Sequence, residues 1–260
     1  MGATRVNKIP IALAILVLLI LISLWSGRDG LPHQPLHYIK GKLGKRPSFY
    51  EIANIHGTDK VTTHHYQQMY EHRLAPFRDK PIKMLEVGLG CDMNYGPGAS
   101  YYTWLDYFTK VDLYYIEYDA ACAKQWANKT TGATIFTGDQ ADVAFLEEFL
   151  REAGSNWDII IDDGGHTMIQ QQTTLSVLWP HVKASGIYFI EDLGTSYQAN
   201  YGGAPDSPTS MMADLKKILD DLNKMGPDKS PISEDVVDFE FTQEVVALTK
   251  RDDYVLPDVI

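Results

Sequence analysis

Two short runs of β-branched and aromatic residues, each ending in a pair of carboxylates, constrain the fold of this chain more than any other feature. The first run, 157–161, ends in Asp162 and Asp163, and the second run, 187–190, ends in Glu191 and Asp192. Both runs have the composition of buried parallel strands, and the segment 167–182 between them has the length and apolar spacing of a helix. A right-handed crossover of this kind brings both carboxyl ends to the same edge of a sheet. We therefore expect Asp163, His166 and the second acidic pair to converge.

A glycine turn and a further carboxylate follow the next two predicted strands. The strand expected at 82–87 runs into Gly88 and Gly90, whose missing side chains let the backbone turn tightly and approach a ligand. The strand expected at 111–116 ends at Glu117. This layout is typical of a site for an adenosine, in which the acid accepts hydrogen bonds from ribose hydroxyls.

The spacing of the glycines favours one class of adenosine cofactor over another. Met93 stands where the dinucleotide fingerprint has its third glycine, which disfavours a pyrophosphate-bearing cofactor such as NAD. A third strand, expected at 133–136, leads to Asp139, where an adenine amino group can be read. These strand-end signals suit S-adenosylmethionine better than NAD.

The remaining apolar patterns complete an α/β domain. We expect helices at 48–54, 66–74 and 211–225, and a closing pair of strands at 236–241 and 245–249. The predicted fold is a seven-stranded, mostly parallel sheet with helices on both faces.

Over about residues 50–250, these motifs resemble the Rossmann-like class I S-adenosylmethionine-dependent methyltransferases. The resemblance is specifically to the macrocin- and mycinamicin-type sugar O-methyltransferases and the cephalosporin-hydroxylase-like proteins. It rests on Glu86-x-Gly88-x-Gly90, Glu117, Gly138-Asp139-Gln140, Asp162-Asp163-Gly164-Gly165-His166, Ile190-Glu191-Asp192, and Gly57-Thr58-Asp59-Lys60 followed by Tyr66 and Tyr70. The resemblance implies S-adenosylmethionine as methyl donor. The residues expected at the donor site are Thr58, Lys60, Glu86, Gly88, Gly90, Glu117, Asp139 and Asp162.

The resemblance also implies a metal site and a general base. Asp163, Glu191 and Asp192 would hold Mg²⁺, and His166 beside Asp163 would remove the acceptor proton. Elementary chemistry agrees, because a hydroxyl attacks a sulfonium methyl poorly until a cation bound to hard oxygens acidifies it. A histidine can then take the proton near neutral pH. The other interpretation of His166 is a cap on the following helix.

A loop after the last acidic pair is the expected acceptor wall. It carries Tyr197 and Tyr201 among glycines, and such a loop suits a lid over the same sheet edge. Two departures from the family pattern stand out. Position 165 is Gly where the relatives commonly have Ser, and the additional N-terminal domain of the macrolide enzymes is replaced by a membrane anchor and stalk.

The N-terminal region differs sharply from the rest. After a flank at 1–8, residues 9–27 contain no charge and predict a transmembrane helix, rather than a cleaved signal peptide. A stalk at 28–47, the methyltransferase domain at 48–250 and a tail at 251–260 follow. We expect a single-pass protein of an endomembrane, whose orientation the flanking charges do not decide. A cytosolic domain is preferred because the donor is made in the cytosol, and glycosylation of the sequon at Asn128 would contradict it.

Composition excludes some partners and leaves others open. A net charge of −11 argues against a nucleic-acid partner. Cys91 and Cys122 are expected to be ordinary buried thiols. The acceptor is a small molecule or, because short anchored fungal homologues include enzymes of ribosomal peptide natural products, a peptide amine. A homo-oligomer, a non-catalytic donor-binding scaffold and an iron-dependent hydroxylase are the other hypotheses, the last disfavoured by a single histidine in the cluster.

Overall fold

The fold is seen in a computed structural model that describes residues 46–226 and 228–252. The segments expected as flank and anchor, nearly all of the expected stalk and the end of the tail lie outside these residues. Among the described helices, none has both the length and the apolar character that a membrane span requires. The anchor at 9–27 therefore stays a prediction.

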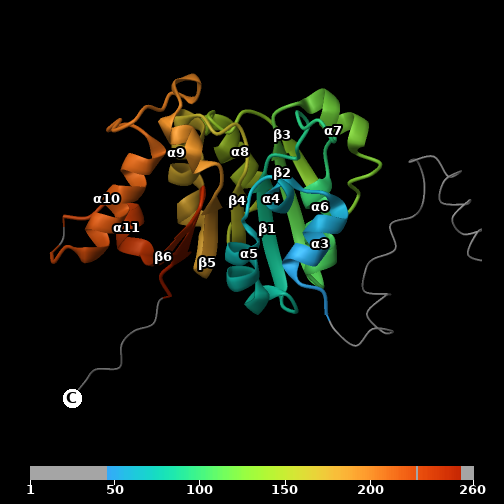
Figure 1. Cartoon of the computed structure of the whole chain (residues 1–260), viewed down its shortest axis with the longest axis horizontal. Helices are drawn as coiled ribbons and strands as arrows, with labels where there is room; N and C mark the ends of the chain where they lie inside the picture. The colour runs from blue at the N-terminus through green and yellow to red at the C-terminus, as the bar shows by residue number, and fades with distance from the viewer. Residues whose placement is uncertain (1–45, 227, 253–260) are drawn as a thin grey trace, which may run out of the picture. The chain divides into compact units, whose positions relative to one another are not determined.

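A single seven-stranded sheet organises the described domain. Its strands are β1 Pro81–Val87, β2 Lys110–Glu117, β3 Ala133–Thr137, β4 Trp157–Asp162, β5 Val182–Ile190, β6 Val236–Thr242 and β7 Val245–Lys250. The strand order is β3-β2-β1-β4-β5-β7-β6 (Figure 1). The first five strands run parallel to one another, and β7 is antiparallel to both β5 and β6. The predicted mostly parallel sheet and its closing hairpin are confirmed.

Helices fill the connections between the strands. The α-helices are α3 Phe49–His56, α4 Asp59–Thr62, α5 Gln67–Leu74, α6 Ala99–Tyr107, α7 Ala120–Trp126, α8 Val143–Ala153, α9 Met168–Leu178, α10 Met211–Asn223 and α11 Pro231–Asp235. Short 3-10 turns are η1 Ala75–Phe77, η2 Trp179–His181, η3 Leu193–Tyr197 and η4 Ala199–Tyr201. The helix expected at 167–182 ends early because Pro180 lacks an N–H and does not fit the helix interior.

Different helices cover the two faces of the sheet. Leu85 and Tyr188 belong to a hydrophobic core with side chains from α8, α9 and α10. Successive residues of a strand point to opposite faces, and Phe189 accordingly packs on the other side, with its ring 5.1 Å from that of Tyr70 in α5. The expected helices on both faces are confirmed, and both layers exclude water from the strands.

The sheet reverses its direction of growth at β1, which lies between β2 and β4. In open parallel sheets, such a switch point leaves a crevice at the carboxyl ends of the strands. Gly88 N–H donates to Ile116 O (2.8 Å) on one side, and Asp163 N–H donates to Val87 O (3.1 Å) on the other. The glycine turn and the first acidic pair are thereby held side by side.

A disulfide joins Cys91 to Cys122, so the prediction of two ordinary buried thiols is wrong. The two cysteines are 31 residues apart in the chain. Cys91 lies in the loop after β1 and Cys122 in the first turn of α7, after β2. Because β1 and β2 are neighbouring parallel strands, the segments after them meet at the same edge. The spacing of the cysteines in the sequence did not reveal that Cys91 and Cys122 lie close together.

Removal of the disulfide is expected to destabilise the domain measurably. Closing a loop of this length restricts the unfolded chain and contributes about 4 kcal/mol to the free energy of unfolding. A Cys91→Ser/Cys122→Ser double variant should therefore unfold at lower urea concentration than the oxidised parent. A reducing agent should move the parent toward the variant and leave the variant unchanged. Coincident unfolding curves for oxidised parent and double variant would contradict this expectation.

Candidate active site

A cavity of about 420 Å³ opens at the carboxyl ends of the central strands. Its wall includes the glycine turn after β1, the end of β2, the loop after β4 and Asp192 after β5. Among the residues predicted for the site, those that line this cavity are Thr58, Gly88, Gly90, Glu117, Asp163, His166 and Asp192. The topology thus brings together residues more than 130 positions apart in the chain.

Gly88 shows why the first strand must end in glycine. Its φ is 98°, in the left-handed region, and a Cβ atom there would lie 2.2 Å from the backbone oxygen of Asp163. Any side chain would push β1 and the loop after β4 apart. The close contact keeps the floor of the cavity narrow and lets backbone groups approach a ligand.

Glu117 is the carboxylate that the end of β2 presents to the cavity. It is 6% exposed, and both of its oxygens accept backbone hydrogen bonds. Leu89 N–H donates to Oε2 (2.9 Å) and Asp119 N–H donates to Oε1 (2.8 Å). The carboxylate is therefore fixed between the glycine turn and the start of α7, with lone pairs left for a ligand hydroxyl.

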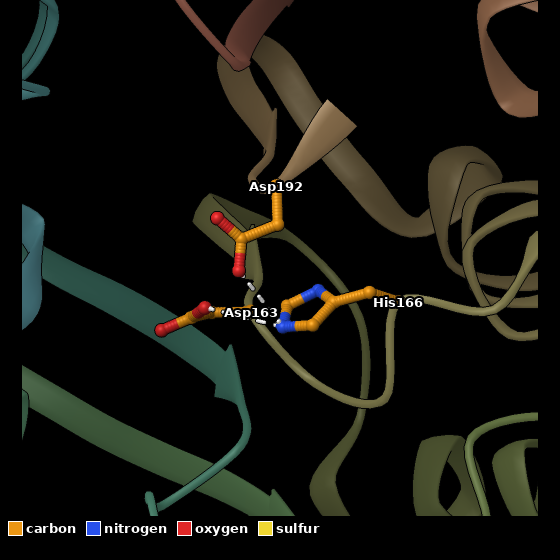
Figure 2. Close-up of side chains that lie close together, drawn as sticks. All are labelled: Asp163, His166 and Asp192. Carbon is orange, nitrogen blue, oxygen red and sulfur yellow. Dashed lines mark ion pairs between the residues drawn. The ribbon is translucent and has the colours of Figure 1, made fainter. Parts of the chain in front are cut away.

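Asp163, His166 and Asp192 form a second group at the same cavity, as Figure 2 shows. His166 Nε2 lies 3.1 Å from Asp192 Oδ2 and 4.0 Å from Asp163 Oδ1. One ligand atom from each residue lies within 4.8 Å of the others. Two carboxylate oxygens and an imidazole nitrogen in this space are a donor set that fits a divalent cation.

The backbone of this trio is held in an unusual conformation. His166 and Asp192 have φ values of 57° and 55°, which L-residues with side chains rarely adopt. Such conformations cost about 1–3 kcal/mol each and persist where the surrounding structure imposes them. Tyr66 supplies part of this restraint, because its hydroxyl donates to Asp192 Oδ1 (2.8 Å).

Lys60 lies in a buried ionic cluster instead of at the cavity. Its ammonium is 2.5 Å from Asp163 Oδ2, 2.8 Å from Glu191 Oε1 and 3.3 Å from Glu86 Oε1. Lys60 is 1% exposed and lines no part of the cavity. We refer to Lys60, Glu86, Asp163 and Glu191 as the Lys60 cluster.

The Lys60 cluster takes up the acid that was expected to be a third metal ligand. Glu191 is 2% exposed, binds the Lys60 ammonium with both oxygens and accepts a hydrogen bond from the Tyr70 hydroxyl. It is not part of the Asp163–His166–Asp192 group. Asp163 belongs to both sets, since Oδ2 faces Lys60 and Oδ1 faces His166.

Electrostatics within the cluster follow from burial and charge. Burial alone would lower the pKa of Lys60, but its carboxylate neighbours outweigh that effect and raise its pKa well above the usual range. Burial and Asp163 raise the pKa of Glu191, against the opposing effect of Lys60. Burial raises the pKa of Asp163 to about 6, although Lys60 and His166 oppose the shift.

Several other predicted residues support the site without lining it. Glu86 accepts hydrogen bonds from the Trp104 ring N–H (2.9 Å), the Ser100 hydroxyl (2.7 Å) and the Tyr115 hydroxyl. Asp162 is fully buried and accepts from Gln140 Nε2 at 2.9 Å.

The remaining predicted residues also lie away from the cavity lining. Asp139 Oδ1 accepts from Ala141 N–H and stabilises its own turn. Tyr197 and Tyr201 are also outside the lining, and Tyr197 is 48% exposed.

The structure also adds residues that sequence reasoning missed. Tyr95, Tyr118 and Gln140 line the cavity, and Gln140 Oε1 accepts from Gly165 N–H (2.8 Å) in the loop that carries His166. His64 also lies close to the site, with its Nε2 3.5 Å from Asp192 Oδ1. Tyr118, directly after Glu117, is exposed, and Gln140 belongs to the Gly138-Asp139-Gln140 motif but was not assigned to the site.

Neutralising Lys60 tests the electrostatic balance of the site. Lys60→Met leaves the buried Glu86 and Glu191 and the partly buried Asp163 without their cation, so the free energy of unfolding should fall by about 3–5 kcal/mol at pH 8. An acid whose pKa is raised by folding binds protons more readily when folded, so stability is lost as pH rises through its folded pKa. The penalty should therefore shrink between pH 8 and pH 5, measured by urea denaturation at both values.

Lys216→Met on the exposed surface of α10 is the matched control for this variant. It should change the free energy of unfolding by less than about 0.5 kcal/mol. A Lys60→Met penalty that is equally large at pH 5 and pH 8 would show that lost packing, and not unpaired charge, causes it.

Comparisons with known proteins agree with this geometry. No family model matches the chain. The chain is 31% identical over 213 residues to 8-demethyl-8-alpha-L-rhamnosyl tetracenomycin-C 2'-O-methyltransferase of Streptomyces olivaceus, covering 79% of this chain and 55% of that protein. It is 35% identical over 188 residues to the 8-demethyl-8-(2-methoxy-alpha-L-rhamnosyl)-tetracenomycin-C 3'-O-methyltransferase of the same organism, covering 70% and 45% respectively. The chain thus spans about half the length of these curated relatives.

A solved structure shows the same fold. The MycE methyltransferase from the mycinamycin biosynthetic pathway, in complex with Mg and SAH, is 25% identical with a TM-score of 0.70. The match covers 80% of this chain and 55% of that chain. The described domain therefore has the Rossmann-like methyltransferase fold, and its sequence is similar to O-methyltransferases of sugars in natural-product pathways.

Proposed function

We propose that this chain is an S-adenosylmethionine-dependent O-methyltransferase that acts on a sugar hydroxyl of a small molecule with the help of a divalent cation. One observation carries the proposal. The fixed carboxylate Glu117 and the Asp163–His166–Asp192 group line the same cavity. A methyl-donor site and a cation site within one cavity are what an activated hydroxyl and a sulfonium methyl require. The named activities of the relatives support this choice of reaction.

The donor would occupy the side of the cavity between the glycine turn and β2. Glu117 would accept hydrogen bonds from ribose hydroxyls, because its oxygens are fixed at the wall by Leu89 and Asp119. The backbone at Gly88 leaves room for a close approach to the ligand. The donor, once bound, supplies an electrophilic methyl group.

The cation would be held by Asp163 and Asp192, and bound there it would lower the pKa of an acceptor hydroxyl. His166 Nε2 faces the same space and would remove the hydroxyl proton. Lys60 would keep the Asp163 carboxylate oriented by binding its Oδ2 atom. Glu191, paired with Lys60, would act through the cluster.

We also propose that the protein is anchored in a membrane by its N-terminal segment. Residues 9–27 lack charge and are long enough to span a bilayer, which supports a single-pass anchor ahead of the domain. Extraction of the full chain from membranes at alkaline pH would contradict an integral anchor.

Donor binding is expected to depend on Glu117. Glu117→Ala should raise the Kd for S-adenosylmethionine, and for its demethylated product, by at least about tenfold, because a buried charged hydrogen bond is lost. Isothermal titration of the parent and the variant measures both values. Glu147→Ala on the exposed side of α8 should leave them unchanged. Parent protein that binds neither compound would show that the likeness to methyltransferases is one of fold alone.

Substitutions at the trio separate a metal ligand from a general base. Asp192→Asn should weaken Mn²⁺ binding, followed by electron paramagnetic resonance, by at least about tenfold, since a charged ligand is lost. His166→Asn should leave Mn²⁺ affinity within about threefold yet lower methyl transfer to a panel of glycosides by about 10²–10⁴-fold. Asp220→Asn, exposed on α10, is the control. Loss of Mn²⁺ binding in His166→Asn would instead make His166 a ligand.

A further inference from the structure

The disulfide beside the cavity indicates the kind of cellular compartment in which this domain folds. The chain has two cysteines, and Cys91–Cys122 uses both of them. Stable structural disulfides belong to oxidising compartments, because cytosolic reductants keep thiols reduced. Cys91 also lines the cavity, so the bond ties the loop that follows the glycine turn to α7. The disulfide is therefore part of the structure that forms the cavity wall.

A second, independent feature lies six residues after Cys122. Asn128-Lys129-Thr130 is the one Asn-x-Ser/Thr triplet in the sequence. Asn128 is exposed in the turn after α7 and is not among the residues that line the cavity. Exposed turns are where N-linked glycans are carried, and a glycan on Asn128 would leave the cavity wall intact.

The third residue of the triplet indicates when the glycan would be added. Thr130 is 2% exposed, and its hydroxyl donates to Trp126 O at 3.1 Å. The folded domain therefore hides the hydroxyl on which recognition of the triplet depends. Transfer would have to precede folding, as it does when a chain enters a glycosylating compartment during synthesis.

We propose that Asn128 is an N-glycosylation site and that this domain resides in an oxidising, glycosylating compartment. This reverses the cytosolic orientation preferred from the sequence. The charge-free segment 9–27 provides a means of delivery, because an apolar segment of this length directs a chain into the membrane system. The inference does not depend on the proposed enzymatic activity.

The experiment expresses the full chain in a eukaryotic cell and treats it with peptide-N-glycosidase F. The parent should lose the mass of one glycan, whereas Asn128→Gln should migrate as the unglycosylated form without treatment. Thr130→Ser, which preserves the triplet and its hydroxyl, is the matched control and should retain the glycan. Mass spectrometry of unreduced peptides should show Cys91 linked to Cys122.

A second, introduced glycosylation site tests the compartment of the domain separately from the glycosylation of Asn128. Met225→Thr completes a triplet at Asn223; Asn223 is the last residue of α10, Met225 follows the helix, and both are exposed. In the Asn128→Gln background, a glycan at Asn223 supports the compartment. Absence of any glycan there, with both cysteines free to alkylation, would overturn it. A glycan at Asn223 in a chain whose Asn128 stays unmodified would overturn the assignment of Asn128.

Discussion

The buried ammonium of Lys60 is the interaction on which the site depends. It neutralises carboxylates at the ends of β1, β4 and β5 and attaches α4 to all three strands. Burying such charges is costly, and the cost is met only while each charge keeps its partner. The ammonium thereby allows Asp163 to stand ionised at the cavity, with one oxygen held and the other free for a ligand. The carboxylates at this edge of the sheet thus depend on the Lys60 ammonium, although Lys60 itself does not line the cavity.

Much of this arrangement could be predicted from the sequence, because strand ends are easy to recognise and parallel strands end at one edge. What the sequence did not distinguish were the two members of the second acidic pair, Glu191 and Asp192, which were both expected to hold the metal. In both pairs the first acid, Asp162 or Glu191, is buried, and the second, Asp163 or Asp192, lines the cavity. Neighbouring residues point in opposite directions, but the face that each one meets is decided by distant side chains such as Gln140 and Lys60.

The disulfide was missed for a related reason. Two cysteines on either side of a predicted strand carry no signal of pairing, and their separation of 31 residues is compatible with many arrangements. Only the parallel pairing of β1 with β2 places the loop after one strand next to the helix after the other. The same pairing positions Glu117 beside the glycine turn. A single neighbour relation in the sheet thus explains both the wall of the cavity and its covalent cross-link.

The left-handed backbone at His166 and Asp192 determines how experiments on this site can be interpreted. Asparagine, aspartate and histidine are the residues with side chains that adopt this conformation most often. Replacing either residue by asparagine therefore removes the reactive group without adding backbone strain, so these inactive forms should fold as well as the parent. Loss of activity in either asparagine variant can therefore be assigned to the missing side-chain group and not to a misfolded backbone.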